Sequence, residues 1–202
     1  STDQSREIIK SYGAKVRVLL KENGGPASAF NVGVAAAQGE IICLLDSDDI
    51  WEPEKITSVV EKYQEGYFGL VCHDLSLIDM YGHTTGENLT RFSVGVLEWG
   101  DVKKKDMQSG YPWVFSPTSG MSLPTVLAKK IFPLNEAEWR ISADDPLAHK
   151  AICHAPVGVI DKSLGRYRVH GANGFAAFHS DDFAVRVAAI IDPAKRFFFL
   201  RS

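Results

Sequence analysis

Glu40-Ile41-Ile42-Cys43-Leu44-Leu45-Asp46-Ser47-Asp48-Asp49 runs from a continuous apolar segment directly into three carboxylates. An apolar run of this length that ends abruptly in acidic residues is typical of a strand covered on both faces. Open α/β sheets bind their ligands beyond the carboxyl ends of the strands. The stretch therefore predicts an α/β domain with a site where the three acids follow the strand.

Helix-like and strand-like segments alternate on both sides of this stretch. Helical patterns cover residues 4–12 and 27–38, and Pro53 is well placed to open a third helix. Strand-like runs cover residues 16–20 and 69–78. The alternation predicts an α/β domain with a mainly parallel sheet. The second half of the chain is less regular; we expect helices over 124–131, 144–154 and 181–191 and one or two strands over 157–169.

The composition limits the class of protein. The chain has 202 residues, of which 45% are hydrophobic, and a net charge of −3, so we expect a folded domain with no nucleic-acid partner. Cys43, Cys72 and Cys153 are far apart and form no CxxC pair, which predicts free thiols in a reducing compartment. No apolar run reaches the ~20 residues of a membrane span. The expected location is the cytoplasm.

The three clustered acids predict a cation site. Carboxylates this close repel one another, and their hard oxygen ligands suit Mg²⁺ or Mn²⁺. Asp49 has a simpler alternative role, which is to cap the helix that follows. An EF-hand starting at Asp46 is excluded because its fifth, sixth and twelfth positions hold Ile50, Trp51 and Thr57. The chain also has no P-loop string.

Several segments, taken in order, resemble family 2 glycosyltransferases of the GT-A fold. Residues 22–33 resemble the family's "ENxGxxxARNxG" helix, residues 39–42 its "GEYI" strand, and residues 46–55 its DxD motif with the "PEKL" helix. Residues 77–82 resemble the hairpin after the next strand, and Ser1-Thr2-Asp3 resembles the end of "DDGSTD".

The resemblance implies a GT-A-like (Rossmann-like), three-layer α/β/α domain with a mixed sheet over residues 1–174. A C-terminal helix and apolar tail are expected over residues 175–202. In this family the first strands, which hold the nucleobase, come before the "STD" segment. We therefore expect the base-binding part of the donor site to lie outside these 202 residues.

The family transfers a sugar from a nucleoside-diphosphate donor to an acceptor hydroxyl and inverts the anomeric centre. The resemblance implies a UDP-sugar above other donors, a glycan or lipid-linked acceptor, and a role in polysaccharide biosynthesis. It assigns Asp46 to the ribose or the metal shell and Asp48 to the Mg²⁺ or Mn²⁺ that bridges the two phosphates. His170, in a stretch similar to the family's "YRxH", is a further candidate metal ligand.

The general base of the family comes from an "ED" pair at a helix start, which Asp144-Asp145 resembles. The resemblance makes Asp145 the base and Asp144 a supporting acid. Like-charge repulsion in such a pair raises one pKa, which suits a base that works near neutral pH. The simpler alternative is that both acids merely begin a helix.

The resemblance further implies donor binding by Asp46, Asn31, Gly120 and Arg168. Gly120 would allow close backbone approach to the donor, with an ordinary turn as the alternative. Arg168 would meet the diphosphate, with a surface salt bridge as the alternative. Phe30 departs from the pattern, because the family usually has a basic residue there.

Two other functions stay open at the level of sequence. Phe30 favours an inactive binding module of the same fold, whereas the intact DxD, DD and YRxH strings favour an enzyme. A nucleotidyltransferase of the same fold would need a Gly-rich phosphate loop at its first strand. Peripheral membrane contact through Phe197–Leu200, at the inner membrane face, and assembly into a homo-oligomer also stay open.

Overall fold

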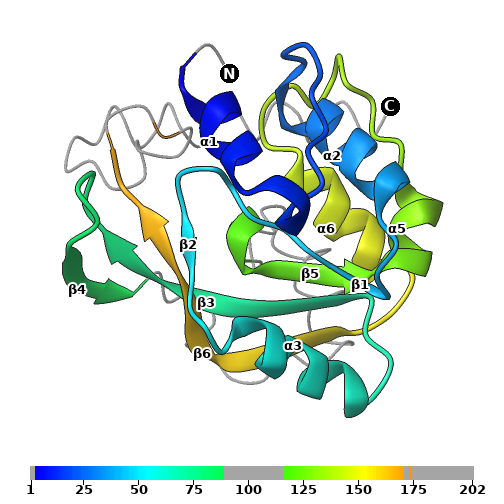
Figure 1. The fold of residues 1–202 in the computed structure, drawn as a ribbon. Helices are drawn as coiled ribbons and strands as arrows, with labels where there is room; N and C mark the ends of the chain where they lie inside the picture. Colours follow the sequence, from blue (N-terminus) through cyan, green and yellow to red (C-terminus); the bar gives the residue numbers. More distant parts are fainter. Residues whose placement is uncertain (1–2, 89–115, 171–172, 174–202) are drawn as a thin grey trace, which may run out of the picture.

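The computed structural model describes residues 3–88, 116–170 and 173 (Figure 1). Its helices are α1 (Ser5–Ser11), α2 (Gly25–Ala36), α3 (Lys55–Gln64), α5 (Thr125–Ile131) and α6 (Asp144–Ile152), with 3₁₀ turns η1 (Gly13–Lys15) and η2 (Thr118–Gly120). Its strands are β1 (Ile41–Cys43), β2 (Ile50–Trp51), β3 (Leu70–Ile78), β4 (Thr84–Asn88), β5 (Met121–Pro124) and β6 (Val157–Arg168).

The strands form one mixed sheet in the order β1-β5-β3-β6-β2, and β4 pairs with β3. The expectation of a mainly parallel sheet is wrong for the described strands, because only β3 and β6 pair in parallel. β1 and β3 do run in the same direction, as the βαβ alternation predicts. They are not neighbours, however, because β5 lies between them and is antiparallel to both.

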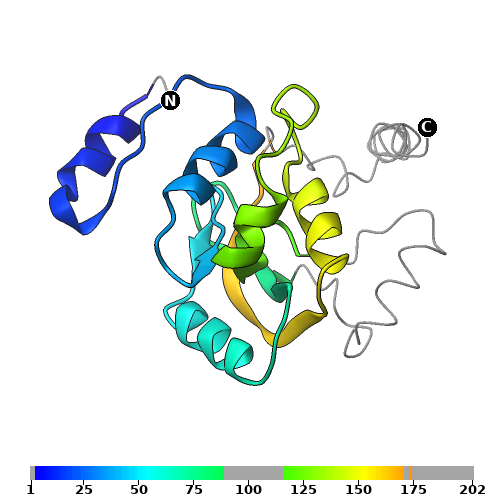
Figure 2. The same cartoon turned by 90° about the vertical axis from the view of Figure 1, so that its right-hand side faces the viewer.

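Helices cover both faces of the sheet, which confirms the α/β class and the three-layer arrangement. α3 lies on one face, and α2, α5 and α6 lie on the other (Figure 1). The main core forms between the sheet and the second group, through buried residues such as Leu70, Met121, Leu127 and Leu147. In Figure 2, α1 and the segment after it stand apart from the other helices.

Residues 16–20 form no strand, although their β-rich composition predicts one. Val16, Leu19 and Leu20 are exposed, and no strand of the described residues pairs with this segment. A strand needs a neighbour for its ladder hydrogen bonds, so composition alone did not suffice here. The predicted hairpin at 77–82 is confirmed by the pairing of β3 with β4. The expected helix at 181–191 and the tail at 197–200 lie outside the described residues.

Candidate active site

The acidic loop (residues 46–49) leaves the sheet just after β1. Leu44 anchors the start of the loop, because its side chain is buried and its N–H donates to the carbonyl of Met121 on β5 (3.1 Å). The loop closes as a turn in which the N–H of Asp49 donates to the carbonyl of Asp46 (3.2 Å). The three acids therefore have different surroundings.

Asp48 meets His170, the last residue of the predicted metal set. Its Oδ2 lies 2.9 Å from Nε2 of His170, and the side chains of Asp48 and His170 are 37% and 30% exposed. Asn173 fixes the end of β6 here: it accepts from the N–H of His170 (2.5 Å) and donates to the carbonyl of Arg168 (2.7 Å). Two predicted ligands thus come together from positions 122 residues apart.

A carboxylate oxygen and an imidazole nitrogen in contact, both reachable from solvent, are suitable ligands for Mn²⁺ or Mg²⁺. The residues present therefore fit a divalent ion held at Asp48 and His170. Asp46 does not join them, since no group of three acid, His or Cys side chains among the described residues is arranged to hold a metal. Any further ligands would have to come from elsewhere, such as water or a bound phosphate.

Asp46 is instead coupled to Asp144, the first residue of α6. Burial raises the pKa of Asp46 to about 7, and the negative charges of Asp144, Asp49 and Asp48 add to the shift. Burial also raises the pKa of Asp144, which is only 7% exposed. Thr118 on η2 hydrogen-bonds to both carboxyl groups and opposes both shifts. Asp46 of the acidic loop and Asp144 of α6 therefore lie in the same buried region.

The raised pKa of Asp46 predicts a pH-dependent stability in the metal-free chain. Between its ordinary pKa of 3.8 and about 7, the folded state keeps a proton that the unfolded state has lost. This stabilising contribution is complete below pH 3.8 and disappears as the pH rises through about 7. We expect the Asp46→Asn variant to lack this part of the decline in the free energy of unfolding.

Denaturant unfolding in EDTA between pH 6.5 and 8 measures this difference. The window avoids His73, whose pKa burial lowers to about 4, so that its opposite contribution ends near pH 6.5. It also stops at about 8, the value to which burial lowers the pKa of Lys55. Equal slopes for the wild type and Asp46→Asn would contradict the prediction.

Asp144 and Asp145 begin α6, as the simpler alternative expects, but they do not lie on a solvated helix end. Each is 7% exposed. Carboxylates are seldom this buried unless they are paired or functional. Nδ1 of His149 lies 2.7 Å from the carbonyl oxygen of Asp145, which adds a contact within the first turns of the helix. A helix start alone therefore does not account for the two acids.

Asp49 does not cap the helix after it, so that prediction is wrong. Its Oδ2 accepts from the hydroxyl of Ser119 (2.6 Å), and its Oδ1 accepts from the N–H of Arg168 (2.9 Å). α3 begins after Glu54 without a side-chain cap from the described residues. Asp49 instead connects the acidic loop to η2 and to the end of β6.

Arg168 also has a different role from those expected. Its Nε donates to the carbonyl of Asp48 (2.7 Å), and its Nη1 donates to the carbonyls of Asp79 (3.3 Å) and Met80 (3.2 Å). Among the described residues it forms no salt bridge, so they give no support to the salt-bridge alternative. Because Nε and Nη1 already donate to backbone carbonyls, the structure does not support a contact between Arg168 and the diphosphate. The side chain joins the acidic loop to the turn after β3.

Gly120 and Asn31 pack against protein groups, which does not support their expected role in donor binding. A Cβ on Gly120 would lie 1.7 Å from Oγ of Ser116 and 2.7 Å from the carbonyl of His73. The close approach that requires glycine is therefore to these two residues. The Asn31 amide donates to the carbonyl of Leu134 (3.0 Å) and accepts from its N–H (2.7 Å). Asn31 thus holds the segment after α5.

Phe30 packs against two clusters of buried apolar residues. A large apolar side chain at this position is explained by core packing. The departure from the family's basic residue therefore no longer favours an inactive site.

Sequence reasoning missed the residues that hold the acidic loop in place. Ser119 and Lys55 are fully buried, and Nζ of Lys55 donates to the carbonyl of Ser119 (2.5 Å). The ammonium group also lies 4.3 Å from the ring centroid of Trp51, and Trp51 Nε1 donates to the same carbonyl (3.2 Å). Helical periodicity was the sequence signal that could have identified Lys55 as buried, because Lys55 lies one turn before buried Val59 on α3.

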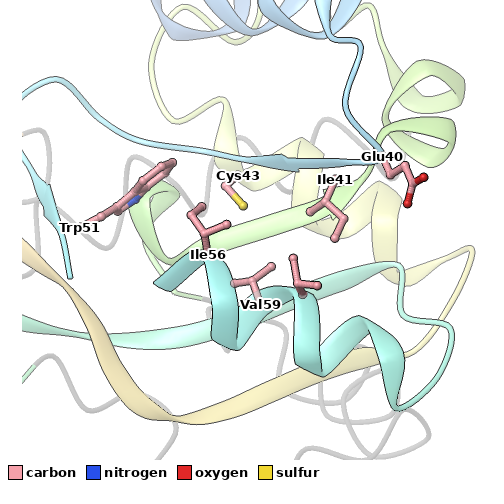
Figure 3. A pocket seen from close by; sticks show the side chains of 7 residues that line it. Glu40, Ile41, Cys43, Trp51, Ile56 and Val59 are labelled. Carbon is pink, nitrogen blue, oxygen red and sulfur yellow. The ribbon is translucent and has the colours of Figure 1, made fainter. Parts of the chain in front are cut away.

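A groove of about 560 Å³ lies between β1 and α3, with Trp51 among its lining residues (Figure 3). It is lined by Glu40, Ile41, Cys43, Trp51, Ile56, Val59 and Val60. No strand of the described residues pairs with the edge of β1 that β5 leaves free. The groove is largely apolar and includes none of the acids of the loop. Separately, no helix in the described ranges is long and apolar enough to cross a membrane.

Comparisons with known proteins agree with this arrangement. Residues 1–123 match the model for Glycosyl transferase family 2. An uncharacterized glycosyltransferase of Nostoc sp. is 34% identical over 177 residues, which cover 86% of this chain and 54% of the relative. Glycosyltransferase GlyG of Streptococcus pneumoniae is 34% identical over 143 residues, which cover 65% and 45% of the two chains. The chain spans about half the length of these curated relatives.

Among solved structures, S. aureus TarS in complex with UDP-GlcNAc superposes with a TM-score of 0.63 and 20% sequence identity. The match covers 98% of this chain and 61% of the TarS 1–349 chain in that structure. At this identity the likeness shows the fold, and it confirms the GT-A-like architecture expected from the sequence.

Proposed function

Because the chain belongs to glycosyl transferase family 2, we propose that it transfers a sugar from a nucleoside-diphosphate donor to an acceptor hydroxyl, with inversion at the anomeric carbon. The observation that carries the proposal is the contact between Asp48 and His170. The contact lies in the loop whose first acid, Asp46, interacts electrostatically with buried Asp144 of α6. It supports a centre that combines a cation site with a candidate base.

Asp48 and His170 would hold Mg²⁺ or Mn²⁺. The ion, when bound, neutralises the charge that develops on the diphosphate leaving group. Carboxylate Oδ2 and imidazole Nε2 would each present a lone pair to it, and Asn173 would keep the end of β6 in place behind His170. Asp46, beside Asp144 and further from solvent, would face the ribose side of the donor.

Asp145 would act as the general base. As the acceptor oxygen attacks the anomeric carbon, its proton passes to the carboxylate of Asp145. The bond from that carbon to the diphosphate oxygen breaks, and the electron pair leaves with the diphosphate. Inversion follows because attack and departure occur on opposite faces of the sugar. Asp144, buried beside Thr118, would support and orient its neighbour.

The donor we propose is a UDP-sugar, for which the UDP-GlcNAc complex of the structurally similar TarS provides support. The acceptor is a glycan or a lipid-linked sugar, and the process is polysaccharide or glycan assembly. The reaction belongs in the cytoplasm, because Cys43, Cys72 and Cys153 are all free thiols, as is typical of a reducing compartment.

Calorimetry with UDP-GlcNAc and a panel of other nucleotide sugars tests this function. It is best carried out on the longest natural form of the chain, with Mn²⁺ and then with EDTA. We expect binding of at least one UDP-sugar that disappears in EDTA. Failure of every nucleotide sugar to bind would instead favour an inactive module. Formation of a nucleotide sugar from a sugar phosphate and a nucleoside triphosphate would favour the nucleotidyltransferase.

A further inference from the structure

We propose that Ser119 and Asp49 are positioning residues of this site, which together fix the acidic loop against η2 and the end of β6. The inference rests on the proposed function for its consequence in metal binding. Its structural part stands on the hydrogen bonds among these residues. Neither residue has a chemical role in the proposed sugar transfer itself.

The hydroxyl of Ser119 has two partners that fix its direction. It accepts from the backbone N–H of Asp46 (3.0 Å) and donates to Oδ2 of Asp49 (2.6 Å). Ser119 is fully buried, so water does not replace either partner. Rotation of this hydroxyl would leave a buried donor or acceptor unpaired, which is costly. One side chain therefore sets both ends of the acidic loop.

The backbone carbonyl of Ser119 is itself fixed by two hydrogen bonds. Its carbonyl accepts from Nε1 of Trp51 and from Nζ of Lys55. Two donors on one carbonyl fix the orientation of the peptide, so the side chain stays turned toward the loop. The positive charge of Lys55 also lies near enough to Asp49 to interact with it electrostatically. A buried cation thus offsets part of the repulsion among the acids.

Asp49 extends the connection to the metal side of the site. Its second oxygen accepts from the N–H of Arg168, two residues before His170. The guanidinium of Arg168 donates to the carbonyl of Asp48. Asp48 lies between Asp46 and Asp49 in sequence, so its direction follows from the two neighbours that Ser119 holds. Ser119 therefore acts on Asp48 through Asp46 and Asp49 and not by touching the cation.

Thr118, next to Ser119, connects the same turn, η2, to the acid at the start of α6. It hydrogen-bonds to Asp46 and to Asp144. A shift of η2 would therefore disturb the loop and the start of α6 together. This shared support distinguishes η2 from an ordinary turn between strands.

Ser119→Ala tests the proposal, with Ser122→Ala as the matched control. Ser122 is also buried and lies three residues further on β5, but its hydroxyl donates to the carbonyl of Val71 (3.3 Å) outside the loop. Two quantities are measured: the hydrogen-exchange rate of the Asp46 amide by NMR, and the affinity for Mn²⁺ alone by electron paramagnetic resonance. Circular dichroism checks that each variant is folded.

We expect Ser119→Ala to raise the exchange rate of the Asp46 amide at least tenfold and to weaken Mn²⁺ binding at least tenfold. Ser122→Ala should change each by less than twofold. Asp49→Asn should act in the same direction, and adding it to Ser119→Ala should have little further effect, since the two residues form one contact. If Ser119→Ala is too unstable to measure, Asp49→Asn alone decides the question against the same control.

The proposal is wrong if the Asp46 amide exchanges at the wild-type rate in both Ser119→Ala and Asp49→Asn, or if Ser122→Ala has effects of equal size. A wild-type chain that binds no Mn²⁺ would instead count against the proposed metal site. In that case faster exchange in Ser119→Ala would still support the positioning role. The two failures are therefore distinguishable.

Discussion

Asp145→Asn is expected to lower the turnover number for sugar transfer by about 10²–10⁴-fold, the usual contribution of a general base. The amide of asparagine occupies the same buried space at the start of α6 but does not accept the proton of the acceptor hydroxyl. Donor affinity should stay within about twofold, because Asp145 is assigned to the acceptor side. The measurement is the steady-state rate with a UDP-sugar, together with donor affinity by calorimetry.

Asp144→Asn is the informative comparison for this experiment. Both acids are 7% exposed and both begin α6, so the two variants disturb burial to a similar extent. If Asp144→Asn abolishes transfer while Asp145→Asn keeps most of it, the assignment of the base is reversed. Normal transfer by both variants would exclude a base from this helix altogether.

Asp48→Asn is expected to remove metal-dependent donor binding and to lower transfer by about 10³-fold, since a metal ion supplies several kcal/mol of transition-state stabilisation. Asparagine is a weaker, uncharged ligand, and it leaves His170 without the carboxylate that it contacts at 2.9 Å. The measurements are Mn²⁺ affinity and UDP-sugar affinity in the presence of Mn²⁺. His170→Ala should likewise weaken the binding of Mn²⁺ and the Mn²⁺-dependent binding of the UDP-sugar.

Asp161→Asn provides the matched control for Asp48→Asn. Asp161 is an exposed acid of β6 that interacts electrostatically with Asp74 and lies outside the acidic loop. This variant changes the net charge of the chain by the same amount and should bind Mn²⁺ and donor as the wild type does. Equal loss in the two variants would mean that overall charge, and not a ligand, determines the effect. Unchanged binding in Asp48→Asn would exclude Asp48 as a ligand.

The acidic loop could be predicted from sequence because its signal is local. An apolar run followed directly by carboxylates describes both β1 and the loop after it. The order of the sheet could not be predicted in the same way. β5 lies between β1 and β3 in the sheet but comes after both in the sequence, and nothing in its four residues indicates which neighbours it will have.

The supporting residues were missed because their partners are far away in sequence. The position of Asp49 before a helix suggests a cap, whereas its partners Ser119 and Arg168 are 70 and 119 residues away. Lys55 begins a helix with an apolar period, and a charge there suggests solvent. Its burial makes sense only with the carbonyl of Ser119, 64 residues away. Local patterns report propensity and periodicity and do not report such pairs.

The same long separations decide when the site forms during folding. Asp48 is synthesised 122 residues before His170, the side chain that it contacts. Contacts between distant positions form slowly, because long loops must close before any gain in energy follows. The end of β6 is held near the acidic loop by its long-range pairing with β3 and with β2. The carboxylates of the acidic loop are therefore among the first parts of the site to leave the ribosome, and the contacts around them are among the last to be completed.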